Sequence, residues 1–264
     1  SLNITKNYPV TFGVVQTSFG GGYIDCAISK FNAVGTIKYF STYIGGNKED
    51  QILNCVIQNE EIAVFGYTSS DTFPIIKNGF QPKHAGERDY FILKLDTSGK
   101  VLISSTYLGG KRTECFSNIS NNTNYYGTAP GELIMDEQNN CYIIGNSSSF
   151  NYPTTAGSFQ QFCDSTNYGD MVVTKLNSNL TQLFWSTYYG GVFGEMPAGI
   201  RLSKSGVLYC AGATTGPDFY TTTGVISTTK IVTPDLVAFS LNSTTGLPIA
   251  STYLGSKGSD VGYR

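Results

Sequence analysis

Residues 105–110 read STYLGG, and close copies of this stretch recur along the chain of 264 residues. The copies are STYIGG at 41–46, STYYGG at 186–191 and STYLGS at 251–256, so successive copies begin 64, 81 and 65 residues apart. A catalytic motif normally occurs once per active site, whereas a phrase repeated at regular intervals indicates a repeated structural unit. The stretch therefore predicts an architecture built from units of about 64 residues.

One unit, between Gly46 and Gly110, shows the alternation of apolar and polar residues that predicts β-strands. Four strands are expected, at 52–57, 62–68, 90–96 and 101–107. Tight turns, with the sequences NEE and DTSGK, join the first strand to the second and the third to the fourth. A long loop joins the second strand to the third. The other units repeat this order, with an aromatic residue, Pro and Gly in the long loop and an Asp before the third strand.

The pattern predicts an all-β fold, because no segment has the 3.6-residue period of a helix. Four short antiparallel strands per unit favour a β-propeller in which each unit forms one blade. A tandem array of β-sandwiches is the alternative. Sandwich domains need about 100 residues each, and the unit is shorter than that.

The repeat divides residues 1–264, taken as part of one propeller domain, into whole and partial blades. We expect a partial blade at 1–46, whole blades at 47–110, 111–191 and 192–255, and the start of another blade at 256–264. The extra residues of the longest unit form an insertion at 111–130. An incomplete ring would leave strand edges and one blade face uncovered. The expected partners therefore include other blades of a longer chain.

These motifs together resemble the SBBP family, the seven-bladed β-propeller repeat. The resemblance rests on STYLGG followed by an acidic residue, a strand that ends in Gly, [FY]P, and D-x-φ-φ-x-K-L-[DN], and it covers essentially the whole chain. It implies a propeller fold in a large secreted or surface-attached protein of bacteria or archaea, and hence an extracellular or cell-surface location. It does not imply one particular reaction.

Composition narrows the classes of partner. The net charge is −2, and the 17 Lys and Arg residues are scattered along the chain. We therefore expect no nucleic-acid partner, since nucleic-acid-binding domains carry clustered basic residues. No apolar run approaches the ~20 residues that span a bilayer, so no transmembrane segment is expected in this chain.

Two acidic positions recur in every unit. One precedes the third strand, and the other follows the Gly-Gly pair. We interpret the first as a structural position that binds backbone N–H groups of its turn, in preference to a metal or acid/base site. The second has the same interpretation, with calcium binding as its alternative. The first set is Asp25, Asp89, Asp170 and Asp235, and the second is Asp50, Glu114, Glu195 and Asp260.

No catalytic set is evident in the sequence. His84 is the only histidine, and its place in a loop predicts a solvated side chain. No Ser lies in a G-x-S-x-G context, and the glycines of FGGGY at 19–23 lack the spacing of a phosphate-binding loop. We expect no catalytic residue, no metal site and no cofactor.

The six cysteines fall into two groups. Four lie within predicted strands, at Cys26, Cys55, Cys141 and Cys210, where free Cys acts as a small apolar side chain. Cys115 and Cys163 lie in loops that emerge on one side of the same unit. A disulfide between these two is geometrically possible and would suit an oxidising compartment.

The long loops and the insertion give the best indication of function. Loops held by a rigid scaffold often carry binding residues, and aromatic side chains there supply contact area. The residues expected on this binding face are Tyr125, Tyr126, Phe162 and Tyr168. We interpret the chain as a non-enzymatic scaffold that binds a protein or glycan at the cell surface. The alternatives are a polysaccharide-acting hydrolase or lyase, and a passive spacer in a large surface protein.

Overall fold

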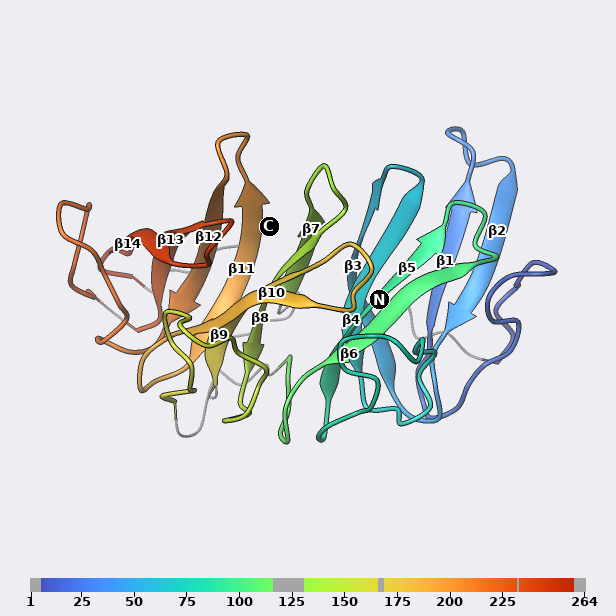
Figure 1. Ribbon diagram of the computed structural model, residues 1–264, viewed down its shortest axis with the longest axis horizontal. Coiled ribbons are helices and arrows are strands. Elements are labelled where there is room, and N and C mark those ends of the chain that lie inside the picture. Colours follow the sequence, from blue (N-terminus) through green and yellow to red (C-terminus); the bar gives the residue numbers. More distant parts are fainter. Residues whose placement is uncertain (1–5, 116–130, 166–168, 232, 259–264) are drawn as a thin grey trace.

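The structure is a computed structural model that describes residues 6–115, 131–165, 169–231 and 233–258. The described residues form four antiparallel sheets and no helix (Figure 1). The first sheet has two strands, and each of the others has four consecutive strands paired in chain order. The strands are β1 (Cys26–Phe31), β2 (Lys38–Ile44), β3 (Asp50–Gln58), β4 (Glu61–Thr68), β5 (Asp89–Asp96), β6 (Leu102–Leu108), β7 (Gly131–Met135), β8 (Cys141–Ser147), β9 (Asp170–Leu176), β10 (Leu183–Tyr189), β11 (Glu195–Leu202), β12 (Val207–Thr214), β13 (Asp235–Asn242) and β14 (Pro248–Tyr253).

The all-β prediction is confirmed, as is the grouping of strands in fours. The four strands expected in one unit correspond to β3, β4, β5 and β6, with ends that differ by two residues or fewer. The tight NEE turn between β3 and β4 places Asn59 and Glu60 at positive φ, at 47° and 64°. Two central residues with positive φ are typical of the hairpin turn whose twist matches that of its strands.

The turns at the ends of the third strands are stabilised by one polar side chain each. Asp96 Oδ1 accepts the N–H groups of Lys100 and Val101, and Gly99 takes a φ of 70°. Asn32, Asn177 and Asn242 accept backbone N–H groups in the same way. The last residue of the D-x-φ-φ-x-K-L-[DN] motif is therefore a turn-forming residue.

The core consists of three apolar layers, each between two successive sheets. Phe40 and Ile44 of the first sheet pack with Val64 and Leu93 of the second. The next two layers join β3–β6 to β7–β10 and β7–β10 to β11–β14. Figure 1 shows the four sheets side by side along the long axis, with the hairpins of β1–β2, β3–β4, β7–β8 and β11–β12 on the upper side.

The repeated Lys of the D-x-φ-φ-x-K-L-[DN] motif joins one sheet to the next by hydrogen bonds. Lys30 Nζ donates to the carbonyl oxygen of Thr97 (3.0 Å). Lys94 Nζ donates to that of Asn139 (2.8 Å), and Lys175 Nζ to that of Ser243 (3.4 Å). Each acceptor lies in a hairpin of the following sheet. The Lys of the repeated motif thus acts as a connection between sheets, and Ser240 holds this position in β13.

The long loops cover the outer edge of each sheet. Tyr107 N–H on β6 donates to Gln81 O in the loop between β4 and β5, and Tyr188 N–H on β10 donates to Gln160 O in the loop between β8 and β9. The loop aromatics Phe73, Tyr152 and Phe219 are buried. An uncovered edge strand can pair with other chains, so these loops protect the edges of their own sheets.

Candidate functional site

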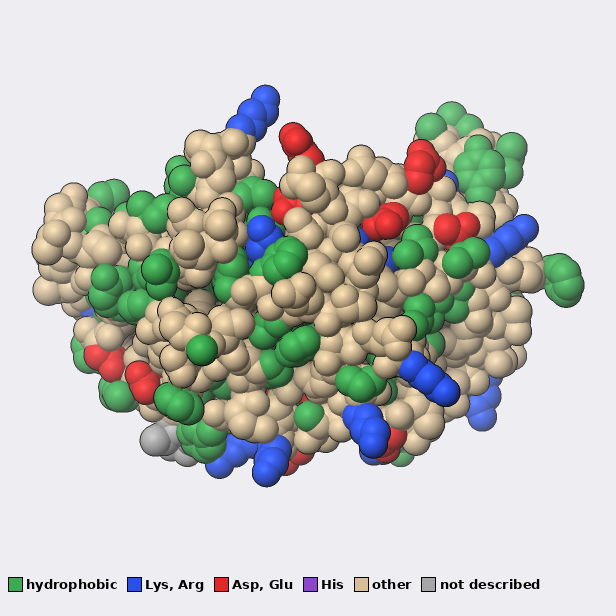
Figure 2. Space-filling model, in the orientation of Figure 1, with side chains coloured by type: hydrophobic (Ala, Val, Ile, Leu, Met, Phe, Trp, Pro, Cys, Tyr) green, Lys and Arg blue, Asp and Glu red, His purple; other side chains and the backbone are tan. Residues whose placement is uncertain are grey.

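Several exposed apolar side chains lie in the segment before β1 and in the longer connections between strands. Phe12 is 99% exposed, Tyr23 88% and Phe162 69%. Phe12 and Tyr23 precede β1, and Phe162 lies between β8 and β9. Figure 2 shows that uncharged side chains cover the middle of the visible face, with charged groups spread around its upper and lower rims. The members of this set, here called the long-loop patch, are Phe12, Tyr23, Phe150, Phe162, Val192, Phe193, Tyr220 and Ile226.

Only one of the four aromatics expected on the binding face can be placed. Phe162 lies in the long-loop patch, and the amide of Gln160 donates to its carbonyl oxygen. Tyr125, Tyr126 and Tyr168 lie outside the described residues, as does most of the insertion at 111–130.

The four repeated Asp residues are buried, with Asp25 directly before β1 and the others at the first position of β5, β9 and β13. Asp89 Oδ2 accepts from the N–H of Ala85 (2.8 Å) and from the amide of Gln81 (2.9 Å). Asp170 Oδ2 accepts from the N–H of Asp164 and the amide of Gln160. Asp25 and Asp235 each accept one loop N–H, from Gly20 and Ile231. These carboxylates thus hold the end of the long loop against its sheet.

The second acidic position lies close to the first. Glu114 Oε2 accepts from Gly110 N–H (3.1 Å) and its Oε1 from the Ser147 hydroxyl (2.8 Å). A Cβ atom on Gly109 would lie 2.4 Å from Glu114 Oε2 and 2.6 Å from Asp89 Oδ1. The two carboxyl groups therefore meet across one glycine. The same arrangement recurs at Gly190, where Glu195 Oε2 and Asp170 Cγ would lie 2.5 Å and 2.8 Å from an added Cβ.

Burial raises the pKa of these carboxyl groups, and the neighbouring acid of each pair adds to the effect in several of them. The pKa of Glu114 rises to about 8, that of Asp170 to about 7 and that of Asp25 to about 6. Burial also raises the pKa of Asp89 and that of Glu195. A buried pair of like charges resists full ionisation.

The Gly-Gly pairs of the repeated stretch are explained by lack of space and not by a special backbone conformation. A sharp chain reversal predicts glycines that use their conformational freedom, but Gly45, Gly109 and Gly190 do not have positive φ. Space is the actual reason, because a Cβ at any of them would collide with a buried carboxyl group. The following glycine is also crowded, since a Cβ on Gly110 would lie 2.5 Å from Ser149 Cβ.

One repeated residue of the junctions was not singled out from the sequence. Gln81 connects the repeated Asp to the Gly-Gly pair. Its amide donates to Asp89, and its Oε1 accepts from Gly109 N–H (3.0 Å). Gln160 makes the same pair of contacts with Asp170 and Gly190. The signal in the sequence was a Gln at a similar place in three long loops, two or three residues after the loop Gly.

The prediction that His84 is solvated is wrong. Its side chain is only 6% exposed, with Nε2 3.2 Å from Thr68 O and the ring against Tyr107. Nδ1 lies 3.7 Å from Asp71 Oδ1. The long loop places His84 between Tyr107 of β6 and the end of β4, where solvent hardly reaches the ring.

The structure contains no disulfide between Cys115 and Cys163, since both are free thiols. They lie in the same apolar cluster, where burial raises the pKa of each thiol to about 12. Cys163 Sγ is directed at the carbonyl oxygens of Ser165 (3.4 Å) and Ser147 (3.9 Å). Both cysteines act as buried packing residues, and this pair gives no support for an oxidising compartment.

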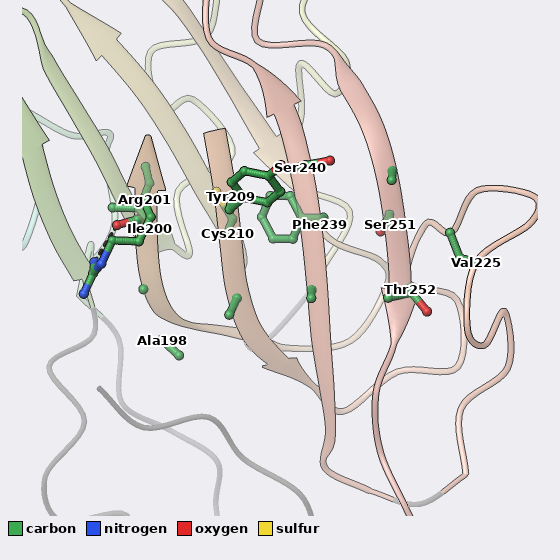
Figure 3. Close-up of a pocket in the computed structure, with 14 residues that line it drawn as sticks. Ala198, Ile200, Arg201, Tyr209, Cys210, Val225, Phe239, Ser240, Ser251 and Thr252 are labelled. Atoms are coloured by element: carbon green, nitrogen blue, oxygen red, sulfur yellow. Dashed lines mark hydrogen bonds between the residues drawn. The ribbon is translucent and has the colours of Figure 1, made fainter. Parts of the chain in front are cut away.

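An apolar groove of about 570 Å³ lies on the face of β11–β14. Figure 3 shows its lining residues coming from all four strands, together with Val225 of the loop between β12 and β13. Small side chains such as Ala198, Ala211 and Ala238 form its floor, and Tyr209 is 55% exposed. At one end Arg201 Nη1 binds Glu132 Oε2 of β7 (2.7 Å).

Among the described residues, no three His, Cys, Asp or Glu side chains converge as metal ligands would. The described part of the chain also has no helix that could cross a membrane. Comparisons with known proteins return no match, either to a protein-family model or to a curated protein.

Proposed function

We propose that this chain is part of a β-propeller of the SBBP type, which acts as a non-enzymatic scaffold in a secreted or cell-surface protein. The scaffold presents its long-loop patch to a protein or glycan partner. The observation that carries the proposal is the repeated stacking of sheets with loops of one kind on one side.

The order of contacts between sheets supports a propeller. β7, the first strand of its sheet, contacts β3 and β11, the first strands of the sheets on either side. First strands that neighbour one another are the expected inner strands of a propeller, where they surround the central axis. Each sheet also packs face to face on the next through an apolar layer.

The groove on β11–β14 supports the expectation of further blades. On β3–β6 the corresponding face carries Ala63, Phe65 and Ile92, all buried under the next sheet. The repeat places Tyr209, Ala211 and Ala238 at these positions. An uncovered apolar sheet face is typical of an interaction site. We propose that another four-stranded sheet covers this face and brings side chains large enough to fill the groove left by the alanines.

The long-loop patch supports a binding role over that of a passive spacer. Single exposed apolar residues are ordinary on a protein surface. Here eight large ones lie in four segments, which are the stretch before β1 and the connections β8–β9, β10–β11 and β12–β13. The junction carboxyl pairs do not favour the alternative of a polysaccharide-acting enzyme, because their buried oxygen atoms are closed to a polymer.

Binding to a panel of immobilised glycans and bacterial surface proteins tests the proposal. Phe162→Ser should weaken binding about tenfold, the loss that corresponds to about 1.4 kcal/mol. Val34→Ser is the control, because Val34 is also apolar and exposed but lies in the tight turn between β1 and β2. Equal loss in both variants contradicts a role for the patch. Sugar release from the panel would favour the enzyme, and no binding at all would favour the spacer.

A further inference from the structure

The acidic pairs at the sheet junctions have an unmatched oxygen atom. Asp89 Oδ1 and Glu195 Oε2 are buried, and neither has a hydrogen bond of normal geometry. Asp25 Oδ1 and Asp235 Oδ1 are in the same position. Burial of a carboxylate oxygen without a hydrogen-bond partner is unfavourable. Because this oxygen recurs at each junction, we expect it to have a partner there.

The geometry of the Asp89–Glu114 pair limits what that ligand can be. Asp89 Oδ1 and Glu114 Oε2 approach the same point beside Gly109 from two sides. This point has no room even for a methyl group on Gly109, and a hydrated ion is larger. When Glu114 carries a proton, its carboxyl group is a hydrogen-bond partner of Asp89.

We propose that each junction binds one proton between its two buried carboxyl groups, and that the sheets pack together with this proton in place. The pairs are Asp25–Asp50, Asp89–Glu114 and Asp170–Glu195. In the second pair the proton resides on Glu114, whose O–H donates to the unmatched oxygen of Asp89. In the third it resides on Glu195.

In the third pair, the distribution of donors favours the glutamate as the protonated partner. Asp170 accepts from Asp164 N–H and Gln160 on Oδ2 and from Ser165 N–H on Oδ1. Glu195 accepts from the Thr214 hydroxyl on its Oε1, and the Gly191 N–H is its one backbone donor. Donors stabilise the ionised form of a carboxyl group. The aspartate is therefore the better anion, and the glutamate keeps the proton.

Few cations face these pairs to offset a second negative charge. His84 lowers the pKa of Asp89 and that of Asp50. Arg88 is directed elsewhere, at the Tyr67 ring (4.4 Å) and at the Cys115 carbonyl oxygen. The other titratable groups facing the second pair are the buried phenols of Tyr90, Tyr107, Tyr152 and Tyr188. The third pair faces three further acidic or weakly acidic groups, namely Asp164, Asp218 and Cys163.

Loss of the proton has a defined direction with pH. An ordinary Glu has a pKa of about 4.3, and that of Glu114 in the fold is about 8. Between these values the folded protein holds a proton that the unfolded chain releases. Stability from the junction is therefore complete at acidic pH and is lost as the pH rises towards 8. With the proton released to solvent, two carboxylates repel each other between two sheets.

Counting protons during unfolding tests the inference on the whole chain. Calorimetric unfolding at pH 7 in buffers of different ionisation enthalpy should show protons released on unfolding, with about one fewer in Glu114→Gln. The Gln amide can still donate to Asp89, so this variant should also be less sensitive to alkaline pH. Glu137→Gln, the same change at an exposed position, should release as many protons as the unsubstituted protein.

Infrared spectroscopy of the unsubstituted protein gives a second readout that needs no variant. A protonated carboxyl band should persist at pH 7 and disappear on unfolding. The inference is overturned if this band is absent, or if Glu114→Gln and Glu137→Gln release equal numbers of protons.

Discussion

Substitution of Lys94 by Met tests whether the repeated lysine joins one sheet to the next. The side chain of Lys94 is fully buried, and its Nζ donates to Glu61 Oε2 (2.9 Å) and to Asn139 O (2.8 Å). Met fills a similar volume and adapts its shape. The change therefore removes the two hydrogen bonds and leaves little cavity.

The expected loss follows from these two contacts. A hydrogen bond to a charged group contributes about 1.5–3 kcal/mol, and removal of one member of a buried ion pair costs about 3–5 kcal/mol. Glu61 is 24% exposed and regains some hydration, so we expect a loss at the lower end, about 3 kcal/mol. At about 2–4 °C per kcal/mol for a domain of this size, Tm should fall by about 6–12 °C.

Denaturant unfolding followed by tryptophan fluorescence and circular dichroism measures this loss. Lys100→Met is the matched control, because it is the same change at an exposed position in the turn between β5 and β6. The control should change the free energy of unfolding by less than about 0.5 kcal/mol. If Lys94→Met lowers the free energy of unfolding by less than about 1 kcal/mol, and no more than the control does, the reasoning is refuted.

Three further predictions follow from single contacts. Gly109→Ala should lower the free energy of unfolding by about 1–3 kcal/mol, because the added methyl group overpacks the site against the carboxyl pair. Gly258→Ala is the control, since Gly258 has open space around it. Equal effects of the two changes would contradict the steric account. Tyr90→Phe should cost about 1–3 kcal/mol, because its hydroxyl serves two buried backbone N–H groups; the same change at exposed Tyr209 should be neutral in a parallel denaturant titration. A thiol reagent should modify only Cys55 in the native protein and six cysteines after denaturation without reductant; four reactive thiols would instead indicate a disulfide.

Local pattern was sufficient to predict the strands. The nearly continuous apolar run at 90–95 follows from the two faces of β5, each packed against a different sheet. The hairpin residues at 96–99 were equally readable, because turn chemistry depends on neighbours in sequence.

The junction chemistry could not be predicted in the same way. The steric reason for Gly109 depends on Asp89 and Glu114, and only the paired sheets bring these residues together. Likewise, Lys94 looks like a surface residue near the end of an apolar strand, and its backbone partner, Asn139, lies 45 residues away in the next hairpin. His84 was misjudged because its burial depends on the path of a long loop, for which no local pattern exists.

An experimental structure of the longest natural protein that contains this sequence tests the central claim most directly. The account predicts a propeller in which β3, β7 and β11 surround one axis and a further four-stranded sheet covers Tyr209 and Ala211. An open row of sheets with these residues in solvent, or a fold of another kind packed on them, would contradict it.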